Sequence, residues 1–528
     1  MKKNEKIVIE KKVDQTIDIV LDTIKINKQC IIFVNTKKSA ESLAQKISQQ
    51  IKNVELKDLS EKILTALNTP TTQCQKLSKC VLKGVAFHHS GLVATQREIV
   101  EQNFKDKKIK IIVATPTLAM GVDLPAYRVI IKDVKRFGVW GMQNIPVLEF
   151  EQQAGRAGRP SYDTHGEAIL LAENDIEKNE LLKKYINGSP EEIYSKLAVE
   201  PIMRTYILSL IATDFITTTH DLENFFSKTF YAFQYGDMNK LRIIISKMLS
   251  QLEDWKFIII EKSDEKEGDK DFVSAIKYAY VGNKNISATH IGRRVSELYL
   301  DPYTANFLIE KLLSAAEIKD IGIMHLICSC LELRPLLRLR TSEFDNILEY
   351  GLSNEENLLV KIPEPYTDEY EEFLSSVKTT KMFMDYLGEH DENYLLENYN
   401  VTPGELNAKK DRADWLLYSL EELSKLLKLT TNSRAISKIR FRLKYGVKEE
   451  LIPLLQLKNI GRIRARKLFD NKIRDIGDVK KVDIVTLSHL IGKNVAIDIK
   501  SQVGQEFNPE KVEVKEGKRK GQISLSDY

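Results

Sequence analysis

The chain has 528 residues and a net charge of only +4, and its content of 43% hydrophobic and 29% charged residues is typical of a globular protein. At roughly 100–200 residues per domain, this length predicts three or four domains, and any affinity for nucleic acid has to come from local charge clusters. Without an apolar signal segment, an apolar run near the ~18 residues that span a bilayer, or metal-ligand spacing among its cysteines, the protein is expected to be cytoplasmic, with no membrane partner and no metal site.

Short apolar runs rich in β-branched residues alternate with helix-like segments in the first third of the chain. They are residues 29–35, 81–89, 109–114, 127–134 and 166–172. This alternation predicts an α/β domain in which a parallel sheet carries helices on both faces. We assign this domain to residues 1–188.

The remainder of the chain is mainly helical and divides into three further folded regions and a tail. Residues 189–288 combine helices with an alternating segment, which is typical of a winged-helix domain. Residues 289–435 predict an all-α helical bundle that is broken at several prolines. Residues 436–505 read as short helices separated by glycines, and residues 506–528 are polar and predicted to be a disordered tail.

Polar side chains follow several of the predicted strands, at the edge of a parallel sheet where ligands bind. Asn35 and Thr36 follow the first strand, His88 ends the second, and Thr115 and Thr117 follow the third. Because such groups suit a sugar–phosphate backbone, we predict that these residues contact nucleic acid. The alternatives are that the Asn-Thr pair caps a helix and that His88, like His89, is a core or capping histidine.

A second set of residues is suited to nucleotide phosphates. The stretch QQAGRAGRP contains Gln152, Arg156 and Arg159, and two arginines spaced in this way reach one anionic centre. A guanidinium is the group best suited to stabilise charge on a γ-phosphate during its transfer. Gly121 permits a close approach of the backbone, and Asp123 adds a carboxylate near the same edge. A surface turn is the alternative for the Gly-Arg stretch.

In order and spacing, four stretches resemble motifs IV, IVa, V and VI in the second RecA-like motor lobe of superfamily 2 helicases of the Ski-like branch: FVNTKKSAE, AFHHSGL, ATPTLAMGVDLPA and QQAGRAGRP. Further along, KLAVEPIMRTYILSLIATDF resembles the winged-helix domain of that branch, and ISATHIGRRVSELYLDPYTA resembles the entry to its ratchet bundle. The C-terminal domain of archaeal Holliday-junction migration helicases is similar to RFRLKYGVKEELIPLLQLKNIGRIRARKLF. The resemblance implies a multidomain fold, in which a RecA-like α/β lobe is followed by a winged helix, an all-α bundle and a helix-hairpin-helix domain.

The first motor lobe of such helicases supplies a Gly-x-x-x-x-Gly-Lys-Ser/Thr loop for phosphates and an Asp-Glu pair for Mg²⁺, and we find neither motif in the sequence. The resemblance therefore implies that ATP and Mg²⁺ are held mainly by a separate polypeptide that supplies this lobe. Because Met1 shortly precedes the second lobe, we expect a split gene in preference to a random truncation. Alone, the chain is expected to bind ATP weakly and to hydrolyse it negligibly.

The resemblance also implies roles for two tryptophans. In the family, a β-hairpin between motifs V and VI acts as a wedge, which places Trp140 against the last base pair, and stacking on an exposed base contributes about 1–3 kcal/mol. Residues 403–423 predict one long helix, in which Trp415 matches the ratchet tryptophan that stacks on a base of the translocating strand. A structural strand pair and a core tryptophan are the alternatives.

The segment from Arg434 to Lys467 is rich in Lys and Arg, and only Glu449 and Glu450 oppose these cations within it. It leads into LKNIGRIRARKL, a helix-hairpin-helix signature in which the turn at Gly461 presents backbone N–H groups to a phosphate. The stretch LSHLIGKNVAIDI resembles a second, weaker copy. We predict that this region binds single-stranded and branched DNA, with Arg464 and Arg466 as leading candidates, whereas a solvated charged face is the alternative.

The last residues of the tail carry a short pattern of their own. Gln522, Leu525 and Tyr528 follow the spacing of peptides that bind a sliding clamp, which predicts such a clamp as a further partner. A chance match is the alternative, because the pattern is short.

Together these features predict the C-terminal subunit of a split ATP-dependent 3′–5′ DNA helicase that acts on replication forks and recombination intermediates. The polarity and the substrate come from the resemblance alone. A non-catalytic DNA-binding scaffold and a fragment of a full-length enzyme are the alternative hypotheses.

Overall fold

The structure, a computed structural model, describes residues 9, 13–52, 54–67, 69–120, 122–138, 141–158, 163, 165–197, 199–261 and 284–505. These residues form two compact units, of which the first draws on 1–194 and 391–409 and the second on 195–390 and 410–528. Among the described residues, no helix is long and apolar enough to cross a membrane. The same residues contain no group of three or more His, Cys, Asp or Glu side chains that could hold a metal ion.

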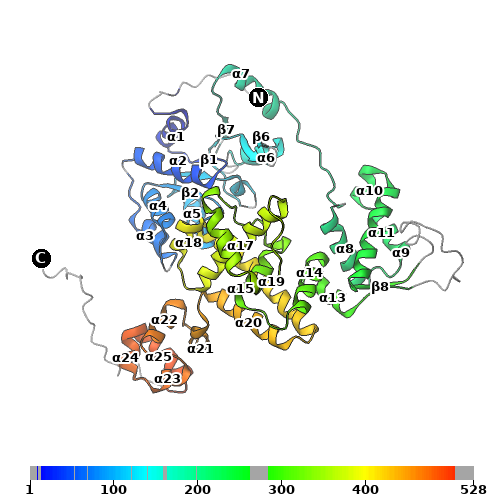
Figure 1. Cartoon of the computed structure of the whole chain (residues 1–528). Coiled ribbons are helices and arrows are strands. Elements are labelled where there is room, and N and C mark those ends of the chain that lie inside the picture. Colours follow the sequence, from blue (N-terminus) through cyan, green and yellow to red (C-terminus); the bar gives the residue numbers. More distant parts are fainter. Residues whose placement is uncertain are drawn as a thin grey trace. The chain divides into compact units, whose positions relative to one another are not determined.

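A five-stranded parallel sheet with the order β2-β3-β1-β4-β7 forms the centre of the first unit (Figure 1). Its strands are β1 (Cys30–Phe33), β2 (Val85–His88), β3 (Ile111–Ala114), β4 (Arg128–Ile131) and β7 (Glu167–Leu170). The predicted parallel sheet is therefore confirmed. The predicted start of the second strand is wrong, because residues 81 and 82 end helix α4 (Thr72–Leu82). Gly84, with a φ of +73°, then turns the chain into β2.

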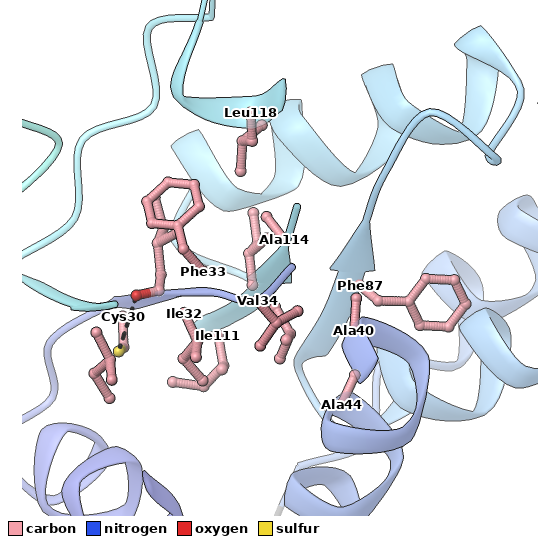
Figure 2. Close-up of a cluster of buried hydrophobic side chains, with 14 of the residues drawn as sticks. Cys30, Ile32, Phe33, Val34, Ala40, Ala44, Phe87, Ile111, Ala114 and Leu118 are labelled. Carbon is pink, nitrogen blue, oxygen red and sulfur yellow. Dashed lines mark hydrogen bonds between the residues drawn. The ribbon is translucent and has the colours of Figure 1, made fainter. Parts of the chain in front are cut away.

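The strands of this sheet are short and apolar because helices and loops cover them. Every residue of β1, β2, β3 and β4 is buried, which is typical of parallel strands covered on both faces. Figure 2 shows the small side chains of Ala40 and Ala44, on helix α2 (Lys37–Gln50), beside Phe87 of β2. These small residues let the helix lie close to the sheet, and all three side chains are fully buried.

Several other helices of the first unit begin at side-chain caps. Asp14, Thr71 and Asn174 each accept a hydrogen bond from a backbone N–H of the helix that follows. These remaining elements are α1 (Gln15–Lys25), α3 (Lys57–Thr65), α5 (Ala94–Lys105), η1 (Pro116–Ala119), α6 (Val147–Ala154), α7 (Asp175–Leu181), η2 (Leu182–Ile186), α18 (Glu392–Tyr399) and the start of α19 (Pro403–Leu426). A separate antiparallel hairpin consists of β5 (Lys135–Gly138) and β6 (Gly141–Asn144).

The second unit begins with a helical region followed by a short antiparallel strand pair. Its helices are α8 (Glu200–Ala212), α9 (Thr219–Ser227), α10 (Phe230–Tyr235) and α11 (Met238–Asp254). Strand β8 (Ile258–Ile260) pairs with β9 (Ile286–Ala288), and β9 lies in the predicted alternating segment. Residues 262–283, which include most of that segment, lie outside the described residues.

An all-α region follows, as predicted. It contains α13 (His290–Glu297), α14 (Pro302–Ser314), α15 (Asp320–Cys328), η3 (Leu331–Leu333), η4 (Thr341–Glu343), α16 (Phe344–Ser353), η5 (Glu355–Asn357), α17 (Asp368–Leu387), the later turns of α19, and α20 (Thr430–Tyr445). The predicted long helix is confirmed, because α19 runs without a break from Pro403 to Leu426.

The last described region consists of short helices around a small core of its own. Its elements are η6 (Glu449–Leu451), α21 (Ile452–Leu455), α22 (Arg462–Asp470), α23 (Ile476–Lys481), α24 (Ile484–Ile491) and α25 (Lys493–Gln502). Leu454, Leu468, Leu487 and Ile499 are among the fully buried side chains of that core. The predicted tail and its clamp pattern at Gln522, Leu525 and Tyr528 lie outside the described residues.

Candidate functional site

The carboxyl ends of three adjacent strands bring the predicted polar residues to one edge of the sheet. Strand β3 lies between β1 and β2, and the register pairs Ala114 with both Phe33 and His88. The three strands therefore end at the same level. The predicted residues at this edge are Asn35, Thr36, His88, Thr115 and Thr117.

The residues that follow β1 are held by the protein itself. The Thr36 hydroxyl accepts a hydrogen bond from the backbone N–H of Ser39 at 3.0 Å and caps α2, so the capping alternative is confirmed. The Asn35 side chain donates to the carbonyl of Lys135, and the Asn35 backbone N–H donates to Asp133 at 3.2 Å. Asp133 was missed in the sequence, although its place just after β4 is the same signal that marked Asn35.

The two threonines after β3 differ in exposure. Thr115 is buried and its backbone N–H donates to the carbonyl of His88 at 3.1 Å, whereas Thr117 is exposed. Their hydroxyl oxygens lie 3.0 Å apart. Thr117 is therefore the more accessible of the two threonines.

The histidine at the end of β2 faces the interior. His88 is 4% exposed, and its Nε2 lies 2.8 Å from Oε1 of Glu101. This hydrogen bond is the main reason that the pKa of Glu101 lies below its usual value. The neighbouring His89 is fully buried and stacks on Phe87. The geometry favours the core alternative for both histidines, and a contact of His88 with DNA stays a prediction.

The segment that carries Arg156 lies directly beside the segment that follows β3. Ala126 and Ala157 form a parallel bridge, and the backbone N–H of Ala126 donates to the carbonyl of Arg156 at 2.9 Å. The Arg156 guanidinium uses Nε and Nη2 to donate to the carbonyl of Ala119, with a distance of 3.2 Å from Nε. Residues far apart in the sequence thus lie together, and we call the group of Ala119, Ala126 and Arg156 the polar corner. Its hydrogen bonds to Ala119 hold the Arg156 side chain there.

The other residues predicted to contact nucleotide phosphates are only partly described. Gln152 on α6 and Asp123 are exposed, while the neighbouring Gln153 is buried. The side chain of Gln152 is therefore the one of the two that can face a ligand. Gly121 and Arg159 lie outside the described residues, and their roles stay predictions.

The predicted hairpin between motifs V and VI is present. Its register pairs Lys135 with Asn144 and Gly138 with Gly141, the last residue of β5 and the first of β6, at the connection between the two strands. Met142 on β6 is 65% exposed, so a large apolar side chain projects close to this connection. Trp140 lies outside the described residues, so the predicted stack on a base pair stays a prediction.

In the second unit, Trp415 lies half-buried on α19. Its indole Nε1 donates to the carbonyl of Leu298 at 2.9 Å, which fixes the ring beside the end of α13. The nearby Arg412 donates to the carbonyl of Arg334. The partly exposed ring fits stacking on a base, and its internal hydrogen bond fits a structural role as well.

The C-terminal region places its predicted DNA contacts in different surroundings. Gly461 caps α22, and a Cβ built there would have no described atom within 4 Å. Arg464 is exposed and donates to the carbonyl of Asn459 at 2.9 Å. Arg466 instead donates to both carboxylate oxygens of Glu389 at 2.8 and 2.5 Å, and to Glu450 at 2.7 Å. These ion pairs raise the pKa of Arg466.

Acidic residues outside the basic segment neutralise further cations of this segment. The pairs are Arg440 with Asp414, Arg442 with Asp320, and Arg466 with Glu389. The sequence could not reveal them, because each acid lies on another element, far from its partner along the chain. Further on, α24 and α25 pack together and are joined at Gly492, whose φ of +92° favours glycine. The second helix-hairpin-helix copy stays a prediction.

Three family models match the chain: the helicase conserved C-terminal domain at residues 11–161, a helix-turn-helix domain at 166–259, and the archaeal helicase domain 4 at 321–446. The ATP-dependent DNA helicase Hel308 of Methanococcus vannielii is 39% identical over 522 residues, which are 93% of this chain and 68% of that protein. The chain belongs to the Hel308 family. The Hel308 proteins of Methanocella arvoryzae and Pyrococcus horikoshii are 36% and 35% identical, and the chain covers 68% and 67% of their lengths.

The matches agree with the architecture at the level of whole regions. The helicase C-terminal model spans β1 to β4 and the segment with Arg156, and the helix-turn-helix model spans helices α8 to α11. The archaeal helicase model covers helices α15 to α20. This Hel308-family chain therefore has a helicase C-terminal lobe with a parallel sheet, followed by helix-turn-helix and helical domains.

Proposed function

We propose that the chain is the C-terminal subunit of a split ATP-dependent 3′–5′ DNA helicase that acts on replication forks and recombination intermediates. The observation that carries the proposal is the polar corner at the sheet edge, where Arg156 is held against Ala119. Its relatives, named ATP-dependent DNA helicases, support the reaction class. The sequence carries no Gly-x-x-x-x-Gly-Lys-Ser/Thr loop, and the proposal assigns the first RecA-like lobe, which completes the ATP site, to a separate polypeptide.

In this proposal, the chain contributes only the part of the nucleotide site that contacts the γ-phosphate. Arg156 and Arg159 stabilise charge on the γ-phosphate, and Gln152 orients the reacting groups. Gly121 and Asp123 line the same edge. The described residues fit this partial role, because they offer a guanidinium and exposed polar side chains. Bound to the first lobe, ATP and Mg²⁺ supply the transferable phosphate and its counter-charge.

The DNA path uses sequence-independent contacts in both units. The sugar–phosphate backbone of the DNA is contacted by the residues at the strand ends, which are Asn35, Thr36, His88, Thr115 and Thr117. The side chains of Trp140 and Trp415 stack on bases. In the C-terminal region, Gly461, Arg464 and Arg466 contact phosphates of single-stranded or branched DNA. Arg464 is the best supported of the two arginines, because it is exposed.

The finer domain assignment belongs to the same proposal. We assign residues 1–188 to the motor lobe, 189–288 to a winged helix, 289–435 to the ratchet bundle, 436–505 to a helix-hairpin-helix domain and 506–528 to a tail that binds a sliding clamp. The β8–β9 pair after α11 supports the wing, and the packed pairs α21–α22 and α24–α25 support the helix-hairpin-helix domain. Deleting residues 521–528 is expected to abolish capture of the chain by an immobilised clamp.

Reconstitution tests the proposal directly. The purified chain is mixed with a polypeptide that carries the first lobe, and ATP hydrolysis is measured with and without single-stranded DNA. We expect negligible turnover by the chain alone and DNA-stimulated turnover by the pair. Brisk turnover by the chain alone would contradict the split site. DNA binding without turnover by the pair would support the alternative of a non-catalytic scaffold.

A further inference from the structure

The backbone that follows Arg156 is held by the segment that precedes β4. The backbone N–H of Gly158 donates to the carbonyl of Ala126 at 2.7 Å, and the N–H of Ala126 donates to the carbonyl of Arg156 at 2.9 Å. These two hydrogen bonds form the parallel bridge between Ala126 and Ala157. The peptide group between Ala157 and Gly158, which comes directly after Arg156, is therefore fixed on the first unit.

Gly166 meets the same peptide group at a distance that only glycine permits. A Cβ built on Gly166 would lie 2.2 Å from the nitrogen of Gly158 and 2.4 Å from the carbonyl carbon of Ala157. Because both atoms belong to the backbone, no side-chain rotation relieves the overlap. Close approach, and not a positive φ, requires glycine at position 166.

The position of Gly166 is set by its neighbour Glu167, the first residue of β7. The backbone N–H of Glu167 donates to the carbonyl of Tyr127 at 2.9 Å. The carboxylate of Glu167 accepts hydrogen bonds from the Tyr127 hydroxyl at 3.0 Å and from Nε of Arg128 at 2.7 Å. The Arg128 side chain is buried and also donates to Thr23 at 2.7 Å. Gly166 is thus attached to a strand end that cannot move aside without breaking these contacts.

A buried ion pair anchors the chain three residues before Gly166. The side chain of Asp163 is only 4% exposed, and its carboxylate accepts a hydrogen bond from Nζ of Lys28 at 2.6 Å. The Lys28 ammonium also lies 5.1 Å from the centre of the Tyr127 ring. Because a buried carboxylate is costly without a partner, Lys28 holds Asp163 at this place. Gly166 therefore has an anchor on each side.

We propose that Gly166 is a positioning residue for Arg156. The peptide group after Arg156 is in contact with Ala126 and with Gly166, so a side chain at position 166 displaces this group. The displacement shifts the Arg156 guanidinium, whose Nε lies 3.2 Å from the carbonyl of Ala119. Gly166 acts through Arg156 and touches no ligand itself. The inference rests on the proposed role of Arg156 at the γ-phosphate.

A double-mutant cycle in the reconstituted pair tests this inference. ATP turnover with saturating single-stranded DNA is measured for Gly166→Ala, for Arg156→Ala and for the double variant. We expect Gly166→Ala to lower kcat by about 100-fold, because a misplacement of about 1 Å near a reacting group has an effect of that size. The KM for ATP and the affinity for DNA should change little, since ATP is held mainly by the first lobe in this proposal.

The double variant separates positioning from a general defect of the fold. In the Arg156→Ala background, we expect Gly166→Ala to lower kcat by less than about twofold, because the side chain that it displaces is absent. A general defect would instead multiply with the loss caused by Arg156→Ala. Single-turnover reactions, with the pair in excess over ATP, keep the slow variants measurable.

The matched control is Gly351→Ala, because a Cβ there would lie 3.6 Å from the side chain of Val377, an ordinary contact. This variant is expected to keep kcat within about twofold of the unaltered pair.

If Gly166→Ala unfolds the chain, as seen by thermal denaturation, Asp163→Asn carries the test. This variant keeps an oxygen for Lys28 but removes the charge that attracts it. We expect a smaller displacement, with kcat lowered by about tenfold, and again little effect in the Arg156→Ala background. The control is Glu55→Gln, because Glu55 is an exposed carboxylate that also pairs with lysine side chains.

The outcomes separate the inference from the function on which it rests. Unchanged kcat in folded Gly166→Ala and in Asp163→Asn would overturn the inference and leave the role of Arg156 standing. Losses that multiply in the double variant would overturn it as well. No DNA-stimulated turnover by the unaltered pair, or no loss on Arg156→Ala, would overturn the proposed function of this site and the inference with it.

Discussion

The edge of the parallel sheet and the basic C-terminal region were both predicted to bind phosphates, but their polar groups are available to different extents. At the sheet edge, Thr117 is exposed, whereas His88 and Thr115 are buried. In the basic segment, Arg440, Arg442 and Arg466 are paired with acids from other elements. The comparison shows that the end of a predicted strand indicates where a polar residue lies in the fold. A run of charged residues does not indicate that their side chains are unpaired.

The largest expected effect would come from the polar corner. In the reconstituted pair, Arg156→Ala is expected to lower ATP turnover by about 10³-fold, because arginines that stabilise a transferring phosphoryl group contribute on that scale. Affinity for single-stranded DNA should change little. Arg340→Ala is the control, since Arg340 is an exposed arginine paired only with Glu343 among the contacts described. Equal ATP turnover by Arg156→Ala and the unaltered protein would contradict the proposed role of Arg156 at the sheet edge.

A smaller effect is expected from His325, a histidine that belongs to the core of the second unit. Burial lowers the pKa of His325 to about 4, from its usual value of 6.5. Because the folded pKa is the lower one, stability is fully present above pH 6.5 and falls by about 3 kcal/mol as the pH drops towards 4.

The measurement is the free energy of unfolding at several pH values, for the protein and for His325→Gln. This variant retains a polar group for Ser376, which lies 2.9 Å from His325 Nε2, but does not titrate. The difference in the free energy of unfolding between the protein and His325→Gln should vary with pH between 6.5 and about 4. A constant difference would show that burial of His325 does not oppose its protonation.

Arg466 and Arg464 form a matched pair that tests the second half of the comparison. Arg466→Ala removes the arginine that forms ion pairs with Glu389 and Glu450, and is expected to lower the free energy of unfolding by about 2 kcal/mol. Arg464→Ala should change it by less than about 0.5 kcal/mol, because Arg464 is exposed. Chemical denaturation measures both. Equal losses would mean that the ion pairs of Arg466 add no stability.

The smallest expected effect is on DNA affinity. Arg464→Ala is expected to weaken binding of branched DNA by a few-fold, and to reduce the slope of log affinity against log salt by about one counterion. Fluorescence titrations at several salt concentrations measure both quantities. Arg466→Ala should change the slope less, since its guanidinium is already paired. The opposite ranking would show that the ion pairs of Arg466 open when DNA binds.

Much of the fold was predictable because it depends on local patterns. Apolar runs with β-branched residues identified the five strands, and the long helix from Pro403 was evident from its sequence. The start of β2 was misplaced, because Val81 and Leu82 are as apolar as the strand although they end a helix. Local composition could not separate a buried helical turn from a strand there.

The residues of the candidate site were predictable from the sequence only where they belong to a recognised motif. Asp133 was missed, since its contact with Asn35 depends on the adjacency of β1 and β4. The part of Gly166 was missed as well, because its close approach to the backbone after Arg156 depends on how the chain folds in three dimensions.

By itself, the sequence determined the alternation of strands and helices and the order of the helicase motifs, since periodicity and residue type act over short distances. Only the tertiary structure decided which histidines and arginines are exposed and which are held by contacts within the protein. The reason is that burial, ion pairing and close backbone approach depend on neighbours that lie close in space and far apart along the chain.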